Sequence, residues 1–363
     1  MPPSENLAKN GVVKRFKRTE QKPNKRYIDH SLLNVLSSLL NCGQAFLLPV
    51  SWRDGKLELM KIAILGAGAL GCYYGARLAE DGHDVCFIGR SVYEPIKAEG
   101  LHVESVHGDI HLSQVNVCRN AEECGHVDLA IVCWKTTCND QLQNYLPALV
   151  AEHTEVLTFQ NGMGNAEDIS RFVPAERVYI GLCFVCCMMD EPGQIRHLEG
   201  GDIQFAPFVN TPAGYARAKD FAAMFEKARI VSTAFEHAEQ IQWCKLSWNI
   251  PFNGLCVAHG GISVKKLFTL PGEDARARAI MEEVCQAAEK RGFPLPLDIV
   301  HRQMERTRIM GEFIPSSAVD YLRGRPVEYD AIWGRTLERA HAAGASVPHW
   351  EQLAADIRKR LNR

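Results

Sequence analysis

Residues 60–82 read MKIAILGAGALGCYYGARLAEDG and contain three local signals in succession. The apolar run at 61–65 predicts a β-strand, Gly66-x-Gly68-x-x-Gly71 predicts a tight turn, and residues 72–81 carry apolar side chains at helical spacing. Gly66 permits the turn, Gly68 lets the backbone approach a pyrophosphate, and Gly71 lets the helix pack closely on the strand. This order predicts a dinucleotide site at the N-terminus of the helix, where free N–H groups carry positive potential. The residues expected to form it are Gly66, Ala67, Gly68, Ala69, Leu70 and Gly71. The alternative is a glycine-rich turn that binds no ligand.

The next strand, at 83–88, is followed by Gly89 and Arg90. A site that prefers NAD usually places an acid here for the ribose hydroxyls, whereas an arginine suits the 2′-phosphate of NADP. Arg90 therefore predicts NADPH as the cofactor. The alternative is a solvated arginine at a strand end, and equal affinity for both cofactors, or a preference for NADH, would contradict the prediction.

Two further apolar runs, at 127–134 and 155–159, predict strands that end at Lys135 and just before Asn161. The carboxyl ends of the strands in an open parallel sheet border the ligand crevice, so we expect both residues to contact the cofactor. Ordinary loop chemistry explains either residue equally well, because Asn-Gly is a common turn pair.

Length and composition indicate a soluble chain with two domains. Its 363 residues are 46% hydrophobic and 23% charged, which is enough to bury a substantial core. The 41 Lys and Arg residues nearly balance the 43 Asp and Glu residues, so the charge predicts no nucleic-acid partner. We also predict no membrane partner.

The first 59 residues differ in composition from the rest, with ten basic and five acidic residues. The apolar stretch at 32–50 is too polar for a membrane span and too far from the start for a usual signal peptide. A transit peptide is an alternative, although acidic residues at Glu5, Glu20 and Asp29 argue against it. We interpret 1–59 as a disordered upstream extension, so that the nucleotide-binding domain begins at Met60.

The 13 cysteines lie mostly inside apolar runs, where a thiol behaves as a small hydrophobe. This usage favours a reducing cytoplasm. Cys183 and Cys186 form a C-x-x-C pair, but no second pair follows to complete four metal ligands, so we predict no metal.

A change in pattern near residue 236 predicts the domain boundary. Extended segments at 201–208 and 230–234 precede it, and helical spacing dominates after it. We therefore predict an α/β fold in which a parallel-sheet nucleotide-binding domain at 60–236 is followed by an all-helical domain at 237–363.

The predicted helix at 237–257 is largely apolar and should be buried, but Lys245, Asn249 and Asn253 interrupt that pattern. Their i, i+4, i+8 spacing places an ammonium and two carboxamides on one face, each about 6 Å along the axis from the next. A polar stripe on a buried helix needs partners, which a substrate cleft would supply; the alternative is a stripe that faces solvent. Pro251 removes one backbone N–H and predicts a kink.

Helices predicted at 273–291 and 350–361 have the pattern of packing elements. Glu328 is expected in the first turn of a helix that runs to about Ala342. The helix dipole favours a carboxylate there, so simple capping is an alternative to a role in binding.

Taken together, these motifs resemble the ketopantoate (2-dehydropantoate) 2-reductases from Met60 to the C-terminus. The segments that carry the resemblance are KIAILGAGALGCYYGARLAEDGHDV with Arg90, the strand end at Lys135, Gln160-Asn161-Gly162-Met163-Gly164, the helix of Trp243-Cys244-Lys245-Leu246 with Asn249 and Asn253, and Ser316 to Asp320 followed by Gly-Arg-Pro-Val-Glu328.

The resemblance implies a Rossmann domain, a helical domain and a cleft between them, in which NADPH reduces 2-dehydropantoate to pantoate on the route to pantothenate. It makes Lys245 the general acid, and Lys135 and Asn161 cofactor contacts. The implied substrate ligands are Asn249, Asn253, Ser316 and Glu328. It leaves open whether the chain is a monomer or a homodimer.

Three positions depart from the family pattern: Val327-Glu328-Tyr329-Asp330 replaces Thr-Glu-Ile-Asp, Trp333 replaces an asparagine, and Pro251 lies inside the catalytic helix. They make a different branched or aromatic 2-oxo acid the alternative substrate. An alternative of another class is a non-catalytic NADPH sensor with the cysteines as redox elements.

Overall fold

The computed structural model of the chain describes residues 59–362. The predicted N-terminal extension, 1–59, lies outside the described residues apart from Leu59. Within the described range, none of the helices combines the length and the apolar character needed to cross a membrane.

A ten-stranded sheet forms the first part of the described chain, in the order β4-β3-β9-β8-β7-β6-β1-β2-β5, with β10 paired to β9. The strands are β1 (Lys61–Leu65), β2 (Asp84–Ile88), β3 (Leu101–Ser105), β4 (Ile110–Leu112), β5 (Asn116–Cys118), β6 (Val127–Val132), β7 (Val150–Thr158), β8 (Val178–Glu191), β9 (Gln194–Pro207) and β10 (Ser232–Ala234). Strand β1 pairs in parallel with β2 and β6, so the glycine turn that follows β1 leaves the sheet between neighbours that run in the same direction.

The strands from β5 to β8 along this order are parallel, as predicted for a nucleotide-binding domain. Most residues of β1 and β6 are buried, which suits strands covered on both faces. The sequence did not predict the long antiparallel pair formed by β8 and β9, nor the antiparallel pair of β3 and β4. The result is a mixed sheet.

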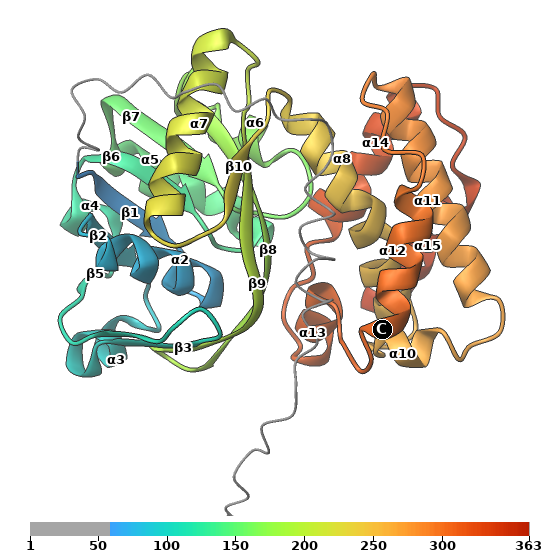
Figure 1. Ribbon diagram of the computed structural model, residues 1–363, viewed down its shortest axis with the longest axis horizontal. Helices are drawn as coiled ribbons and strands as arrows, with labels where there is room; N and C mark the ends of the chain where they lie inside the picture. The colour runs from blue at the N-terminus through green and yellow to red at the C-terminus, as the bar shows by residue number, and fades with distance from the viewer. Residues whose placement is uncertain (1–58, 363) are drawn as a thin grey trace, which may run out of the picture. The chain divides into compact units, whose positions relative to one another are not determined.

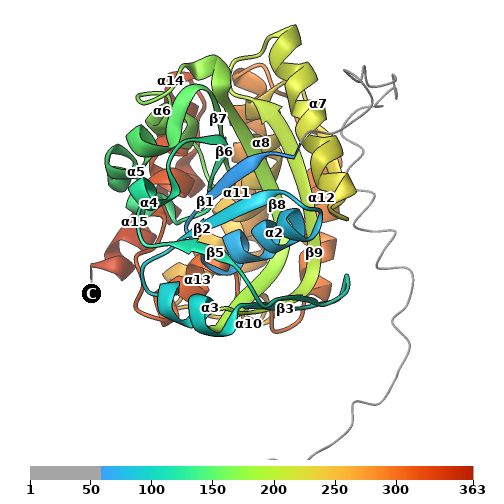
Figure 2. The same ribbon diagram turned by 90° about the vertical axis from the view of Figure 1, so that its left-hand side faces the viewer.

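Helices cover both faces of the sheet (Figure 2). One face packs against α2 (Ala69–Glu80), α3 (Tyr93–Glu99) and α7 (Pro212–Lys227). The other packs against α4 (Ala121–Cys124), α5 (Leu142–Leu149) and α6 (Asn165–Ile169). Two short 3-10 helices, η1 (Thr136–Gln141) and η2 (Ala175–Arg177), lie in the connections.

The remaining chain is helical, and none of its described residues after β10 lies in a strand (Figure 1). Its elements are α8 (Ala238–Trp248), η3 (Asn249–Asn253), α9 (Gly254–Ala258), α10 (Val264–Leu267), α11 (Glu273–Lys290), α12 (Ile299–Ile309), α13 (Ser316–Leu322), η4 (Asp330–Gly334), α14 (Arg335–Ala342) and α15 (Pro348–Leu361). They share a core that contains three fully buried tryptophans, Trp243, Trp333 and Trp350. The predicted fold class, an α/β part followed by a helical part, is confirmed.

The helix predicted at 237–257 is interrupted by the π-helical segment η3, which contains Pro251. Proline removes a backbone donor from the helix, and insertions of this kind accommodate the loss. The indole N–H of the buried Trp333 donates to the carbonyl of Ile250 at 3.0 Å. Two of the departures from the family pattern, Pro251 and Trp333, therefore lie in elements that contact each other, because Trp333 bonds the residue directly before Pro251.

Candidate active site

The glycine turn has the geometry that a bound dinucleotide requires. A Cβ atom at Gly66, where φ is 100°, would lie 2.6 Å from the backbone nitrogen of Trp134. At Gly71 it would lie 2.3 Å from the carbonyl oxygen of Gly66, so the close packing of helix on turn excludes any side chain. At Gly68, by contrast, no atom lies within 4 Å of the Cβ position. The middle glycine therefore faces open space, as expected where a ligand approaches the backbone.

Helix α2 begins directly at this turn, and its N-cap residue Gly68 provides no capping side chain. The first N–H groups of the helix are consequently available to an anion, and no acidic residue lies in the first turn to oppose one. The turn therefore has open space at Gly68 and free backbone donors that fit a pyrophosphate, while contacts from Ala67, Ala69 and Leu70 stay a prediction.

Arg90 lies at the end of β2, two residues beyond Ile88, whose carbonyl accepts from Gly66 N at 3.2 Å and from Ala67 N at 3.3 Å. These bonds fix the end of β2 beside the glycine turn. Arg90 is exposed, and no ion pair holds its guanidinium within the described part of the chain. A guanidinium in this position is free to meet a phosphate on the adenosine end of a cofactor.

Lys135, predicted as a cofactor contact, forms ion pairs across to the helical part of the chain. Its ammonium lies 2.8 Å from Asp320 Oδ2 and 3.2 Å from Glu328 Oε2. Burial lowers the pKa of Lys135, but the two carboxylates outweigh this effect and the net shift is upward. Lys135 thus remains charged and connects the carboxyl end of β6 with two acids of the helical part.

Glu328 is 2% exposed, and its carboxylate accepts from the backbone N–H of Thr136 at 2.9 Å as well as from Lys135. It precedes the helix that continues through η4 and α14, rather than lying in its first turn as predicted. Because both partners belong to the sheet part of the chain, the capping interpretation does not describe this side chain. Glu328 instead presents a buried, held carboxylate at the boundary of the two parts.

Lys245 is partly buried on α8, and its ammonium donates to the carbonyl of Cys183 on β8 at 2.8 Å. The same ammonium lies 5.4 Å from the ring centroid of Phe184. Burial lowers the pKa of Lys245, while Cys183 and Glu328 raise it in part and Lys135 lowers it further. One carbonyl therefore orients an ammonium that gives up its proton more easily than an ordinary lysine does.

The polar stripe has partners inside the protein, so the alternative of a solvent-facing stripe is wrong. Asn249 is 8% exposed and Asn253 is 2% exposed. The amide of Asn253 donates to Asn249 Oδ1 at 3.5 Å, and its oxygen accepts from Ser317 N at 2.9 Å and from the Ser316 hydroxyl at 3.5 Å. Asn253 thus accepts hydrogen bonds from the first turn of α13, and these bonds hold Ser316 beside the stripe.

The turn that contains Asn161 joins the two parts of the described chain. A Cβ atom on Gly162, where φ is 82°, would lie 2.3 Å from the carbonyl oxygen of Ala331 in η4. Met163 N donates to that same carbonyl at 3.0 Å, and Gln242 of α8 donates to Gly162 O at 3.2 Å. Asn161 therefore lies on a tightly packed turn rather than on a free loop.

The structure adds groups that the sequence did not predict. They are the carboxylate of Asp320, the backbone N–H of Thr136 and the carbonyl of Cys183. Asp320 belongs to the Ser316–Asp320 motif and could have been suspected as a buried acid on α13. Backbone groups carry no residue signal, so no sequence pattern could have predicted the other two.

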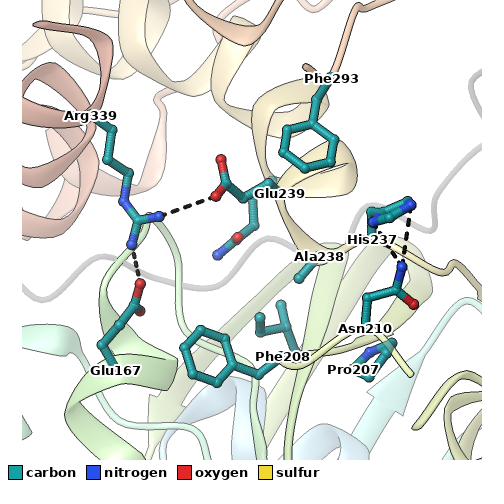
Figure 3. A pocket seen from close by; sticks show the side chains of 11 residues that line it. Glu167, Pro207, Phe208, Asn210, His237, Ala238, Glu239, Phe293 and Arg339 are labelled. Carbon is teal, nitrogen blue, oxygen red and sulfur yellow. Dashed lines mark hydrogen bonds and ion pairs between the residues drawn. The ribbon is translucent and has the colours of Figure 1, made fainter. Parts of the chain in front are cut away.

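A separate pocket of about 220 Å³ lies near the start of α8, and Gln242 is one of the residues that line it (Figure 3). Arg339 projects between Glu167 and Glu239, and Asn210 points toward His237. Arg291 also pairs with Glu239 at 2.6 Å, so ion pairs already occupy the acids of the pocket. None of the predicted site residues lines it, and we do not assign the reaction to this pocket.

Comparison with known proteins identifies the family. The model of the ketopantoate reductase PanE/ApbA family matches residues 62–210, and the model of the C-terminal part of that family matches residues 237–360. The chain belongs to the ketopantoate reductase family. It is therefore an oxidoreductase.

Two proteins that bear the name 2-dehydropantoate 2-reductase are similar to this chain over nearly their full length. A 2-dehydropantoate 2-reductase from Nostoc sp. is 35% identical over 294 residues, covering 79% of this chain and 91% of that protein. The crystal structure of 2-dehydropantoate 2-reductase from Geobacter metallireducens has 38% identity and a TM-score of 0.79, covering 82% of this chain and 99% of that one.

Within the ketopantoate reductase fold, a second kind of enzyme is also similar. The structure of D-mandelate dehydrogenase with NADH and anilino(oxo)acetate has a TM-score of 0.74 at 24% identity, and covers 84% of this chain and 99% of that one. At this identity the likeness concerns the fold alone. The fold is therefore shared by enzymes that act on different acids, and the side chains of the site, rather than the fold, determine the substrate.

Proposed function

We propose that this chain is an NADPH-dependent 2-dehydropantoate 2-reductase that forms pantoate on the route to pantothenate. The observation that carries the proposal is that the structure holds in place both a possible proton donor, the Lys245 ammonium, and a buried carboxylate, that of Glu328. Burial lowers the pKa of Lys245, and the negative charge of Glu328 raises it in part. A proton donor and a hydrogen-bond acceptor match the two polar ends of a hydroxylated 2-oxo acid.

Lys245 is proposed as the general acid. When bound, the nicotinamide supplies a hydride to C2 of the substrate, which leaves negative charge on the C2 oxygen. One N–H of the Lys245 ammonium is directed to Cys183 O, so the other two remain to polarise the ketone oxygen. The ammonium then gives a proton to that oxygen, a transfer that the lowered pKa of Lys245 favours.

Glu328 is proposed to accept a hydrogen bond from the substrate hydroxyl. Thr136 N and the Lys135 ammonium hold its carboxylate in place. Carboxamides at Asn249 and Asn253, with the hydroxyl of Ser316, are proposed to orient the rest of the acid. A buried acceptor left unpaired by an analogue that lacks the hydroxyl disfavours that analogue, so Glu328 supports ketopantoate over an aromatic 2-oxo acid.

A substrate panel tests the proposal. NADPH oxidation is measured with ketopantoate, 3-methyl-2-oxobutanoate, phenylglyoxylate and pyruvate, and we expect the highest kcat/KM for ketopantoate. A higher kcat/KM for phenylglyoxylate or 3-methyl-2-oxobutanoate would assign the site to a different 2-oxo acid. Tight NADPH binding without turnover of any substrate would support the non-catalytic sensor instead.

Arg90→Ala tests the cofactor. The exposed guanidinium has no partner of its own that would hold it in the described chain, so its removal should act chiefly on the bound 2′-phosphate. We expect the Kd of NADPH to rise about tenfold, the loss of one charge-assisted contact, while that of NADH changes little. Arg171→Ala, at another exposed arginine, serves as the control. Equal weakening of both cofactors would contradict a role for Arg90 in choosing NADPH.

A further inference from the structure

Three thiols meet in the sheet part of the chain, outside the candidate active site. Cys86 lies on β2, Cys118 at the end of β5 and Cys124 at the end of α4, and Figure 1 shows these elements side by side. The sulfurs of Cys86 and Cys118 are 3.0 Å apart, and the single S–H of Cys86 can be donated either to Cys118 or to Cys124. A disulfide between the first two requires the sulfurs to approach by about 1 Å. Because Cys118 pairs with Ile88, two residues beyond Cys86, it also requires β2 to shift against β5.

The pKa of the Cys124 thiol is lowered, whereas the pKa values of other buried thiols are raised. The hydrogen bond from Cys86 lowers the pKa of Cys124, burial opposes this, and the Lys61 ammonium lowers it further. Lys61 is held there because its ammonium donates to the carbonyl of Cys124 at 2.7 Å. Burial instead raises the pKa of Cys183 and that of Cys256 to about 12. The thiolate is the reactive form of cysteine, so Cys124 is the member of the cluster best suited to react first.

Backbone hydrogen bonds connect this cluster to the glycine turn. Gly89 N donates to the carbonyl of Cys118 at 3.1 Å, directly before Arg90. The carbonyl of Ile88 accepts from both Gly66 N and Ala67 N. A shift of β2 against β5 would therefore displace Arg90 through the bond of Gly89 to Cys118, and the glycine turn through its bonds to Ile88.

We propose that Cys86, Cys118 and Cys124 form a peroxide-sensitive thiol site whose oxidation to a disulfide weakens NADPH binding. The effect on binding rests on the proposed function, whereas the disulfide itself does not. The oxidant is hydrogen peroxide or a small organic hydroperoxide.

The chemistry balances as the reduction of one peroxide by two thiols. The Cys124 thiolate attacks a peroxide oxygen, the O–O bond breaks, and the hydroxide released takes up a proton to become water. The Cys86 thiol then attacks the sulfur of the Cys124 sulfenic acid; an S–S bond forms, the S–O bond breaks, and the thiol proton leaves with hydroxide as a second water. Cys118 can displace Cys124 from this disulfide, which returns Cys124 to the thiol and moves the bond to Cys86 and Cys118.

Peptide mapping of the full chain tests the modification. The reduced protein is treated with hydrogen peroxide, quenched with N-ethylmaleimide and digested without reductant. We expect peptides that contain Cys86 linked to those of Cys118 or Cys124. Cys124→Ser should slow formation of the link and Cys118→Ser should leave a link between Cys86 and Cys124, whereas Cys285→Ser, on α11, should change neither. Complete labelling of all three thiols while other cysteines are oxidised would overturn the proposal.

Titration with NADPH before and after oxidation tests whether the disulfide weakens NADPH binding. We expect the Kd of NADPH to rise at least about tenfold in the disulfide form, and to return after treatment with dithiothreitol. Circular dichroism of both forms shows whether the fold is retained. A disulfide form that retains the fold and binds NADPH as tightly as the reduced form would overturn the proposal. A reduced chain that binds no NADPH would contradict the proposed function instead, and the peptide map would still decide whether the disulfide forms.

Discussion

Replacing Lys245 with alanine is expected to lower kcat by about 10²- to 10⁴-fold while the Kd of NADPH stays the same. The substitution removes the proposed proton donor and leaves the glycine turn, α2 and Arg90 untouched. Lys266→Ala, at an exposed lysine of α10, is the matched control and should retain full activity. The comparison separates the loss of one specific ammonium from the loss of a positive charge in the helical part.

The pH profile of kcat distinguishes a proton donor from a packing residue. A general acid must be protonated, so the rate of reduction should be constant below the pKa of Lys245 and fall as the pH rises through it. Because burial lowers that pKa, the fall should begin at a lower pH than an ordinary lysine would give. Small primary amines should partly restore turnover of Lys245→Ala. Near-normal kcat in the variant would remove Lys245 from the mechanism.

The features that the sequence predicted well depend on neighbours along the chain. The strand, the glycine turn and α2 span about twenty residues, and two of the glycines are required within that span: Gly66 by its positive φ and Gly71 by the nearby carbonyl of Gly66. The stripe of Lys245, Asn249 and Asn253 is likewise a matter of spacing along one helix, and the burial of its two asparagines followed from the apolar residues around them.

The features that the sequence could not predict depend on partners far apart. The contact between Lys135 and Glu328 joins residues 193 positions apart, and nothing in either segment indicates the other. The ion pairs of Lys135 with Glu328 and Asp320 were therefore not foreseen, and its contact with the cofactor stays a prediction. The helix expected to include Glu328 in its first turn begins one residue later, at Tyr329, and ends at Ala342 as predicted.

Some predictions stay open for a physical reason. The proposed choice of NADPH over NADH rests on a single exposed guanidinium, whose proposed partner is the cofactor itself. The choice of substrate rests on how the buried polar groups around Glu328 are paired when the acid is bound. Both depend on differences in binding free energy, which only affinities and rates measure.

Glu328→Gln is expected to lower kcat/KM for ketopantoate by about 10²-fold, with a smaller effect on an analogue that lacks the hydroxyl. Glutamine keeps the volume and an acceptor for Thr136 N, but it removes the negative charge that faces Lys135 and the substrate. The matched substrates are ketopantoate and 3,3-dimethyl-2-oxobutanoate, which differ only in that hydroxyl. The wild-type enzyme should strongly prefer the first, and the variant should lose most of this preference. Equal losses for both substrates would show that Glu328 does not recognise the hydroxyl.

The same variant has a second effect that a purely structural role would not produce. Glu328 raises the pKa of Lys245, so its neutralisation should lower that pKa further and move the alkaline fall of kcat to lower pH. Glu305→Gln, at an exposed acid of α12, should leave both the substrate preference and the pH profile unchanged. If Glu328→Gln loses activity without any movement of the profile, the carboxylate acts on the substrate alone and not on the proton donor. A loss of preference together with the shift would show that one buried carboxylate sets both which acid binds and how readily it is protonated.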